Sequence, residues 1–256
     1  MNWSAKQYVA FEEERTRPVR DLVAALPDID ARSVADIGCG PGNSTEVLAA
    51  RFPNAQVSGI DSSPDMIAAA RRRLPGASFA LEEAQSWSAP GPFDAILANA
   101  VLQWVPHHEA LLPALISRLA PRGALAVQMP DNLEDLAHRL MREIAAEGPW
   151  AGKLAKAAAK RTALAGAQWY YELLRPRCSG VDLWRTTYYH SLAGGAAAVV
   201  EWFKGSGLRP YLEPLSEDER GAYLGRYTAA IAGAYPALAD GSVLLPFPRL
   251  FMIAIR

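Results

Sequence analysis

The chain has 256 residues, half of them hydrophobic and 21% charged, with a formal net charge of −1. This composition excludes a mainly disordered protein and a broad polyanion-binding surface, which needs many uncompensated Lys and Arg side chains. The length fits one large domain or one domain with an insertion. Of the 26 basic residues 21 are arginine. GC-rich coding explains this bias, but so does a site built for bidentate recognition of an anion.

Targeting and metal-binding signals are not found in the sequence. The N-terminus alternates charged and aromatic residues and has no apolar stretch of the secretory type. No run of about 18 apolar residues predicts a transmembrane helix. The two cysteines, Cys39 and Cys178, and the four histidines lack metal-ligand or redox spacing. We therefore expect a cytoplasmic protein with no metal, no membrane contact and no nucleic-acid partner.

The first half of the chain alternates short apolar runs with helical patterns. Strands are predicted at 33–37, 56–60, 78–81, 95–98 and 123–129. Asn43 or Ser44 is expected to cap a helix that ends near Arg51, and Ser62 or Ser63 before Pro64 opens the next. A further helix is expected over 108–119. This rhythm, with continuous apolar strands, predicts a parallel sheet with helices on both faces.

The second half combines helical segments with two β-rich stretches. Eight of the nine tyrosines lie at or after Tyr170, which indicates a cofactor-binding half followed by a half that contributes to the substrate site. The same aromatics could instead pack the interior of a cap. We expect a single domain made of a helical lid (1–30), a cofactor-binding core (31–130), helical cap elements (131–180 and 194–240) and final strands (181–192 and 243–256).

The most informative segment is VADIGCGPG at residues 34–42. Its glycines follow a predicted strand and precede a predicted helix, where glycine lets the backbone approach a ligand. Asp61 ends the next strand, where a carboxylate can accept both ribose hydroxyls of a nucleoside cofactor. The spacing is G-x-G-x-G, not the G-x-G-x-x-G of dinucleotide sites. Asp36 would repel a pyrophosphate but suits a cationic amino acid group, which favours S-adenosylmethionine (SAM) over NAD.

These residues resemble motif I of the class I SAM-dependent methyltransferases. The resemblance implies a Rossmann-like α/β fold with a seven-stranded, mostly parallel sheet, an antiparallel last strand, helices on both faces and a helical cap. It also implies SAM as cofactor and S-adenosylhomocysteine as product. The cofactor contacts that it implies are Tyr8, Asp36, Gly38, Gly40, Asp61, Ser62, Met66, Glu83, Ala84 and Asn99. The third strand ends Leu81-Glu82-Glu83, so either glutamate is a candidate for the adenine contact.

The segment after the fourth strand, NAVLQW at 99–104, bears on the methyl acceptor. It is not the Asn-Pro-Pro-Tyr type of enzymes that methylate nucleic-acid amino groups, so a small-molecule acceptor is expected. Its Leu-Gln-Trp step resembles that of carboxyl methyltransferases. In one group of these, a Gln on the N-terminal helix and this Trp donate hydrogen bonds to the acceptor carboxylate. The resemblance implies Gln7 and Trp104 as catalytic residues.

Segments outside the cofactor motifs, including DLWRTTYYH, GSGLRPYL and FPRLF, resemble the bacterial trans-aconitate methyltransferases. This resemblance implies esterification of one carboxylate of trans-aconitate or of a closely related small tricarboxylate, by a monomer or weak homodimer. A carboxylate is already ionised at pH 7, so no general base is expected. Orientation and water exclusion would then accelerate the in-line displacement.

The other carboxylates of such a substrate need cations and hydroxyl groups. If 181–192 is a strand, residues 184, 186, 188 and 190 share one face, and residues 185, 187 and 189 share the other. The residues expected to bind substrate are Arg185, Tyr189, Tyr171 and His190, with Arg15, Arg17, Arg209 and Arg249 as further arginine candidates. The alternatives are a methyltransferase of another small acid or metabolite, a NAD-dependent oxidoreductase, and a SAM-binding scaffold without activity.

Overall fold

The computed structural model describes residues 12–89, 91–157 and 163–256. The chain divides into two compact units. The first comprises Met1–Pro130, Leu164–Thr186 and Leu250–Arg256, and the second comprises Asp131–Ala163 and Thr187–Arg249. Residues 164–180, which we expected in the cap, therefore group with the sheet-bearing unit.

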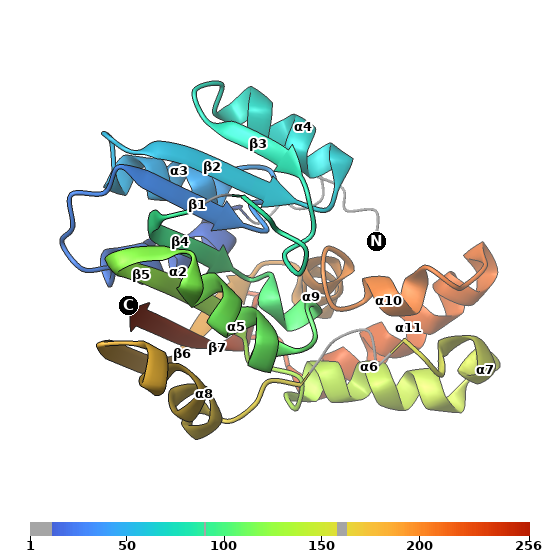
Figure 1. The fold of residues 1–256 in the computed structure, drawn as a ribbon. Helices are drawn as coiled ribbons and strands as arrows, with labels where there is room; N and C mark the ends of the chain where they lie inside the picture. Colours follow the sequence, from blue (N-terminus) through green and yellow to red (C-terminus); the bar gives the residue numbers. More distant parts are fainter. Residues whose placement is uncertain (1–11, 90, 158–162) are drawn as a thin grey trace. The chain divides into compact units, whose positions relative to one another are not determined.

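A seven-stranded sheet has the order β3-β2-β1-β4-β5-β7-β6 (Figure 1). Its strands are β1 (Ser33–Ile37), β2 (Gln56–Asp61), β3 (Ser78–Leu81), β4 (Phe93–Asn99), β5 (Leu119–Pro130), β6 (Gly180–Leu192) and β7 (Val243–Ile255). The first five strands pair in parallel. β7 runs against β5, because Arg122 N donates to Arg256 O while Asp131 N donates to Pro248 O. The predicted fold class is confirmed.

Helices cover both faces of the sheet in the first unit. Its helices are α2 (Glu12–Ala24), α3 (Asn43–Arg51), α4 (Pro64–Arg73), α5 (His108–Ser117) and α8 (Ala167–Leu174), with 3-10 turns η1 (Leu102–Trp104) and η3 (Arg175–Arg177). Figure 1 shows α2 and α3 on one side of the strands and α5 on the other. The main core cluster joins α5 and α8 to the sheet through Leu112, Tyr170 and Ile96. A separate cluster, which includes Cys39, Ile67 and Phe79, lies under α4.

Two predicted helix ends need correction. Gly42, not Asn43 or Ser44, is the N-cap of α3, with φ of 93° and no side-chain cap. Asn43 and Ser44 lie in the first turn, and their side chains bind other parts of the fold. α5 ends at Ser117, two residues before the predicted end, because β5 begins at Leu119. Ser63 is the N-cap of α4 and Pro64 its first residue, as predicted.

The second unit is mainly helical. Its helices are α6 (Leu136–Glu147), α7 (Ala151–Leu154), α9 (Gly195–Lys204), α10 (Arg209–Leu212) and α11 (Glu217–Ala234). Ser216 and Glu219 form a capping box at the start of α11. Two buried tyrosines of α11 bind carbonyls of α6, since Tyr223 Oη donates to Met141 O and Tyr227 Oη to Ala137 O. These tyrosines therefore pack the interior of the unit.

Candidate functional site

A cavity lies at the carboxyl ends of the parallel strands, the edge at which open α/β sheets bind ligands. Its volume is about 260 Å³, just below the roughly 300–1,000 Å³ of typical small-molecule sites. The described residues that line it follow β1, β2, β3 and β4. They are Gly38, Gly40, Asp61, Ser62, Met66, Glu82, Glu83, Ala84, Gln85, Asn99, Ala100, Val101, Trp104 and Val105.

Most of the predicted cofactor residues meet in this cavity. Eight of the ten line it, and so does Trp104. Asp36 does not line it, and Gln7 and Tyr8 lie outside the described residues. Glu82, the alternative to Glu83 for the adenine contact, also lines it, and sequence reasoning missed four lining residues: Gln85, Ala100, Val101 and Val105. Each lies within two residues of a predicted one. A prediction that took in every residue of the strand-end loops would therefore have included them.

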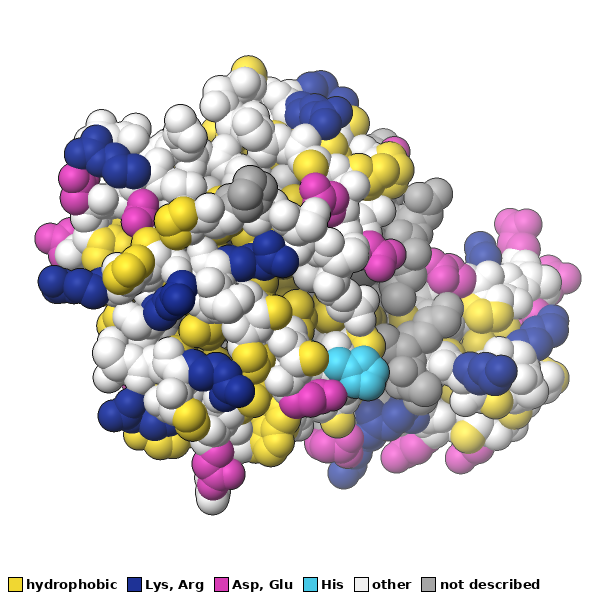
Figure 2. Space-filling model, viewed as in Figure 1, with side chains coloured by type: hydrophobic (Ala, Val, Ile, Leu, Met, Phe, Trp, Pro, Cys, Tyr) yellow, Lys and Arg dark blue, Asp and Glu magenta, His cyan; other side chains and the backbone are white. Residues whose placement is uncertain are grey.

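The charges around the cavity are acidic. Asp61, Glu82 and Glu83 line it, and the described lining contains no Lys or Arg. Figure 2 shows basic and acidic side chains distributed among neutral and hydrophobic ones on the face in view. A concave site with one sign of charge raises the local concentration of oppositely charged ligands. The lining therefore suits a ligand that carries positive charge.

Asp61 ties the two loops at the centre of the cavity together. Its Oδ2 accepts a hydrogen bond from Gly40 N at 3.0 Å, and its Oδ1 accepts one from Ser63 N at 2.8 Å. Burial raises the pKa of this carboxyl, while the backbone hydrogen bonds oppose that change. The carboxylate thus fixes the glycine loop after β1 against the loop after β2. Each oxygen keeps acceptor capacity for a ligand, because a carboxylate offers about four lone-pair sites.

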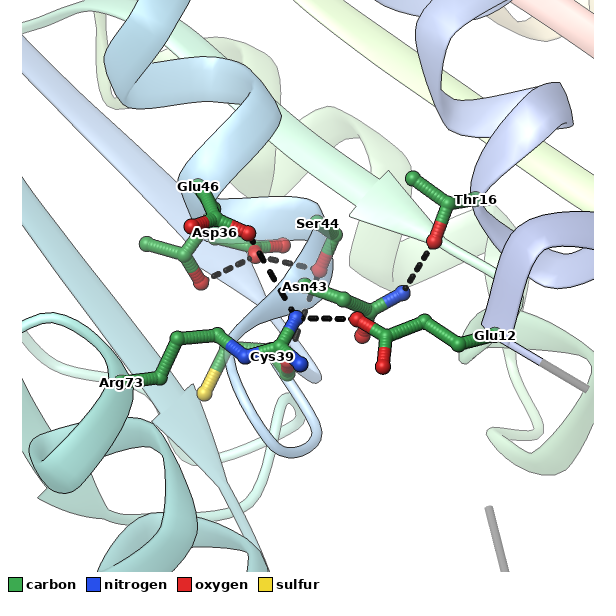
Figure 3. Close-up of polar contacts among 9 residues, drawn as sticks. Glu12, Thr16, Asp36, Cys39, Asn43, Ser44, Glu46 and Arg73 are labelled. Carbon is green, nitrogen blue, oxygen red and sulfur yellow. Dashed lines mark hydrogen bonds and ion pairs between the residues drawn. The ribbon is translucent and has the colours of Figure 1, made fainter. Parts of the chain in front are cut away.

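Asp36 lies beneath the glycine loop and is fully buried. Its Oδ2 accepts hydrogen bonds from Ser44 Oγ and Thr45 Oγ1, both at 2.7 Å, and both residues lie in the first turn of α3. Figure 3 shows the contact with Ser44. Among the described residues, its Oδ1 has no hydrogen-bond partner. Burial, with a smaller contribution from the nearby Asp61, raises the pKa of Asp36 to about 6. Asp36 therefore holds the first turn of α3 under the loop, although its burial makes ionisation of the carboxyl less favourable.

The raised pKa of Asp36 predicts how the stability of the protein depends on pH. Asp36 has a pKa of about 6 in the fold and 3.8 as its ordinary value. The folded protein thus binds more protons between these values, so its stability falls as pH rises through that window and stays low above it. The penalty at pH 7 is about 3 kcal/mol.

Asp36→Asn keeps an acceptor for Ser44 and Thr45 and is expected to be more stable than wild type at pH 7. Urea unfolding at pH 4, 5, 6 and 7 measures the difference, which is expected to grow up to pH 6 and then level off. A difference that shrinks as pH rises would contradict this account.

The start of α2 is fastened beside the same loop. Arg73, at the end of α4, forms ion pairs with Glu12 of α2 and Glu46 of α3 (Figure 3). Asn43 Nδ2 donates to Thr16 Oγ1 of α2 at 3.2 Å. Three helices thus converge on one guanidinium at the side of the glycine loop. The chain segment that holds Gln7 and Tyr8 joins the described fold at this point.

The residues predicted to bind substrate lie elsewhere on β6 and α8. Arg185 and Tyr189 are exposed and His190 is buried, so the predicted division of the strand into two faces is confirmed. Tyr171 is also exposed. None of the four is among the described residues that line the cavity. The other arginine candidates include Arg249, which is 4% exposed and lies 4.7 Å from the Phe247 ring centre.

Two other kinds of feature are absent from the described residues. Across residues 12–89, 91–157 and 163–256, no helix combines the length and apolarity needed to cross a bilayer. In the same described ranges, no three or more His, Cys, Asp or Glu side chains gather in a way that could hold a metal ion.

The strand order, the glycine loop and the acidic strand-end cavity are those of a methyltransferase domain. Residues 11–186 match the family model described as a methyltransferase domain, and the chain belongs to this family. Over its full length it is 54% identical to a trans-aconitate 2-methyltransferase of Methylobacterium nodulans, covering 98% of that protein. It is 51% identical to one of Azoarcus sp., with 99% of each chain covered. The chain is therefore a member of the trans-aconitate 2-methyltransferases, as predicted. Among solved structures it resembles the YcgJ protein of Bacillus subtilis, with a TM-score of 0.59 and 11% identity, over 94% of this chain and 98% of that one.

Proposed function

We propose that this protein transfers a methyl group from SAM to one carboxylate of trans-aconitate, giving the monomethyl ester and S-adenosylhomocysteine. A closely related small tricarboxylate is the alternative acceptor. The observation that carries the proposal is the acidic cavity at the glycine loop, in a chain 54% identical to trans-aconitate 2-methyltransferases. SAM is a cation, and three carboxylates with no cation in the described lining suit it better than they suit a dinucleotide pyrophosphate.

The residues of the cavity have distinct roles in this proposal. Asp61 accepts hydrogen bonds from the ribose hydroxyls, as expected at the end of the second strand. Glu82 or Glu83 binds the adenine amino group, Ala84 provides a backbone N–H, and Met66 packs on the ring. Gly38, Gly40 and Ser62 bring backbone close to the ligand, and Asn99 binds its methionine part. Asp36 contributes indirectly, because it fixes the first turn of α3.

The reaction needs little proton chemistry. Bound SAM supplies an electrophilic methyl group on a sulfonium, and the displaced sulfur keeps the electron pair of the broken bond. The acceptor carboxylate is ionised at pH 7, so its oxygen forms the new bond to carbon directly. Trp104, with Gln7 from the N-terminal segment, donates hydrogen bonds that hold this carboxylate in line. The side chains therefore act by orientation and by excluding water.

A product assay tests the function. Purified full-length protein is incubated with methyl-labelled SAM and with trans-aconitate, citrate or an isopropylmalate-type acid, and methyl esters are identified by mass spectrometry. We expect the ester of trans-aconitate to form fastest. A faster reaction with another acid would reassign the substrate. Formation of no ester from any tricarboxylate would overturn the proposal.

A thermal-shift assay distinguishes SAM from NAD as the cofactor, because a ligand at 100 times its Kd stabilises the folded protein by about 2.7 kcal/mol.

The substrate's remaining carboxylates lead to a prediction about Arg185. Its side chain is exposed on β6, in the unit that also holds the cavity. Exposed ion pairs contribute about 0–1 kcal/mol, so its effect on substrate binding is expected to be small.

Arg185→Ala is expected to raise KM for trans-aconitate by less than about fivefold, as the loss of one exposed ion pair predicts. Arg185→Lys keeps the charge and serves as the control, with thermal midpoints measured in parallel. An unchanged KM in Arg185→Ala would contradict a substrate role for this arginine.

A further inference from the structure

The turn that follows β4 carries one wall of the cavity. Val101, Trp104 and Val105 all line it, and the turn between them is the three-residue η1. One turn of 3-10 helix is weak by itself. Within the turn, Val105 N donates to Leu102 O at 2.9 Å, and Gln103 Nε2 donates to Ala100 O at 2.7 Å. The placement of Trp104 therefore depends on groups that hold this turn from outside.

Gln128 O, which accepts from Ala100 N at 2.8 Å, is one such group, and His108 is another. This histidine is the first residue of α5 and is 7% exposed. Its Nε2 lies 2.9 Å from Leu102 O. A carbonyl oxygen only accepts hydrogen bonds, so the proton of the ring sits on Nε2. The same carbonyl thus receives two hydrogen bonds, one from within the turn and one from α5.

The other ring nitrogen is held by a residue far along the chain. His108 Nδ1 lies 2.8 Å from Tyr170 Oη on α8, and the Tyr170 side chain is fully buried. With the proton on Nε2, a neutral ring accepts at Nδ1, so the Tyr170 hydroxyl donates. The Leu102 carbonyl thus fixes the tautomer, and Tyr170 stabilises it by donating to Nδ1. Both of these interactions lie within the first unit.

We propose that His108 and Tyr170 are positioning residues for methyl transfer: through the Leu102 carbonyl, they hold the Leu102–Trp104 turn so that Trp104 orients the acceptor. The proposal rests on the proposed function. Neither residue lines the cavity, so neither is expected to contact cofactor or acceptor. Misplacement of about 1 Å by a change away from the reacting atoms is enough to cost about 100-fold in rate.

Two substitutions of His108 test its hydrogen bonds to Leu102 and to Tyr170 one at a time. In His108→Gln the amide nitrogen reaches the position of Nε2 and still donates to Leu102 O, whereas the acceptor for Tyr170 is lost. In His108→Asn the amide oxygen lies near the position of Nδ1 and accepts from Tyr170, but nothing reaches Leu102 O. We expect kcat to fall about 10- to 100-fold in His108→Asn and less than about threefold in His108→Gln. Tyr170→Phe is expected to give an intermediate loss of kcat. KM for SAM is expected to stay within about twofold of wild type in all three, because the residues placed at its ribose and adenine lie on other loops.

The neighbouring histidine is a matched control. The His107 side chain is 75% exposed and is paired with Glu109 at the surface. Its backbone is left-handed, with φ of 64°, a conformation that asparagine tolerates. His107→Asn is therefore expected to keep wild-type kcat. Equal losses in His108→Asn and His108→Gln, with equal thermal midpoints, would overturn the proposal, because the Leu102 hydrogen bond would then have no special role.

Nitrogen-15 NMR of labelled histidine tests the geometry without the reaction. We expect His108 to show a protonated Nε2 and an unprotonated Nδ1 at neutral pH, and we expect Tyr170→Phe to shift the Nδ1 resonance. A protonated Nδ1 in the neutral ring would overturn the proposal. If wild-type protein makes no ester, the proposed function fails, but the tautomer found by NMR still shows whether His108 holds the turn.

Discussion

Asp61→Ala is expected to raise the Kd for SAM by about 100-fold or more. The substitution removes the carboxylate proposed to bind the two ribose hydroxyls, and each bond to a charged group contributes about 1.5–3 kcal/mol. It also releases Gly40 N and Ser63 N, which this carboxylate holds in place. Both losses weaken SAM binding, because a more mobile glycine loop loses more conformational entropy when the ligand binds. Isothermal titration calorimetry with SAM measures the change.

Asp94 offers a matched control for this substitution. Its Oδ2 accepts from Arg32 N at 2.7 Å and from Ser33 N at 3.0 Å, so it also binds two backbone N–H groups. Asp94 lies near the start of β4, whereas the cavity follows the ends of the strands. Asp94→Ala is expected to lower stability while leaving the Kd for SAM within about twofold of wild type, because substitutions at distant sites with no shared partners act independently. If Asp61→Ala bound SAM as wild type does, the ribose role would be wrong.

Local patterns in the sequence were enough to predict the framework of the site. The five strands of the first half and the glycine loop depend on apolar runs, turn residues and spacing, all of which are short-range. Asp61 follows from the same logic, because strand ends of a parallel sheet meet at one edge. Eight predicted residues line the cavity for this reason.

Side-chain partners set by the tertiary fold could not be predicted in this way. Asn43 and Ser44 have good capping chemistry, yet Thr16 and Asp36 engage their side chains and Gly42 caps the helix instead. The sequence placed Asp36 at a strand end but gave no sign that α3 would cover it.

The arginines show the same limit. Alternation along β6 correctly separates the two faces of the strand, but it does not say which face meets solvent. Arg185 lies on the exposed face, whereas Arg249 of β7 is buried and lies over the ring of Tyr188 on β6. Burial of a charged side chain depends on contacts between elements, so it needs the tertiary structure.

Gly38→Ala is expected to remove activity by lowering stability and by deforming the cavity. A Cβ at this position would lie 2.3 Å from Val101 Cγ2 and 2.5 Å from Val101 Cβ. The backbone φ of +71° adds a second cost, because left-handed backbone costs about 1–2 kcal/mol for an L-residue. Overpacking costs a further 1–3 kcal/mol or so. We therefore expect a loss of about 2–5 kcal/mol in urea unfolding, with kcat/KM lower by 100-fold or more since both Gly38 and Val101 line the cavity.

Two further variants separate the steric cost from the backbone cost. At Gly40 φ is +55° and a Cβ would meet nothing within 4 Å, so Gly40→Ala is expected to lose only the left-handed cost of about 1–2 kcal/mol. In a Val101→Gly background no side-chain atom remains at position 101, so the clash is absent and only the backbone cost remains. Adding Gly38→Ala there is expected to lower stability by about 1–3 kcal/mol less than it does in the wild-type background. Equal stability losses for Gly38→Ala and Gly40→Ala would show that Val101 yields to the added methyl group. The close approach of the loop to the turn after β4 would then not be the reason that glycine occupies position 38.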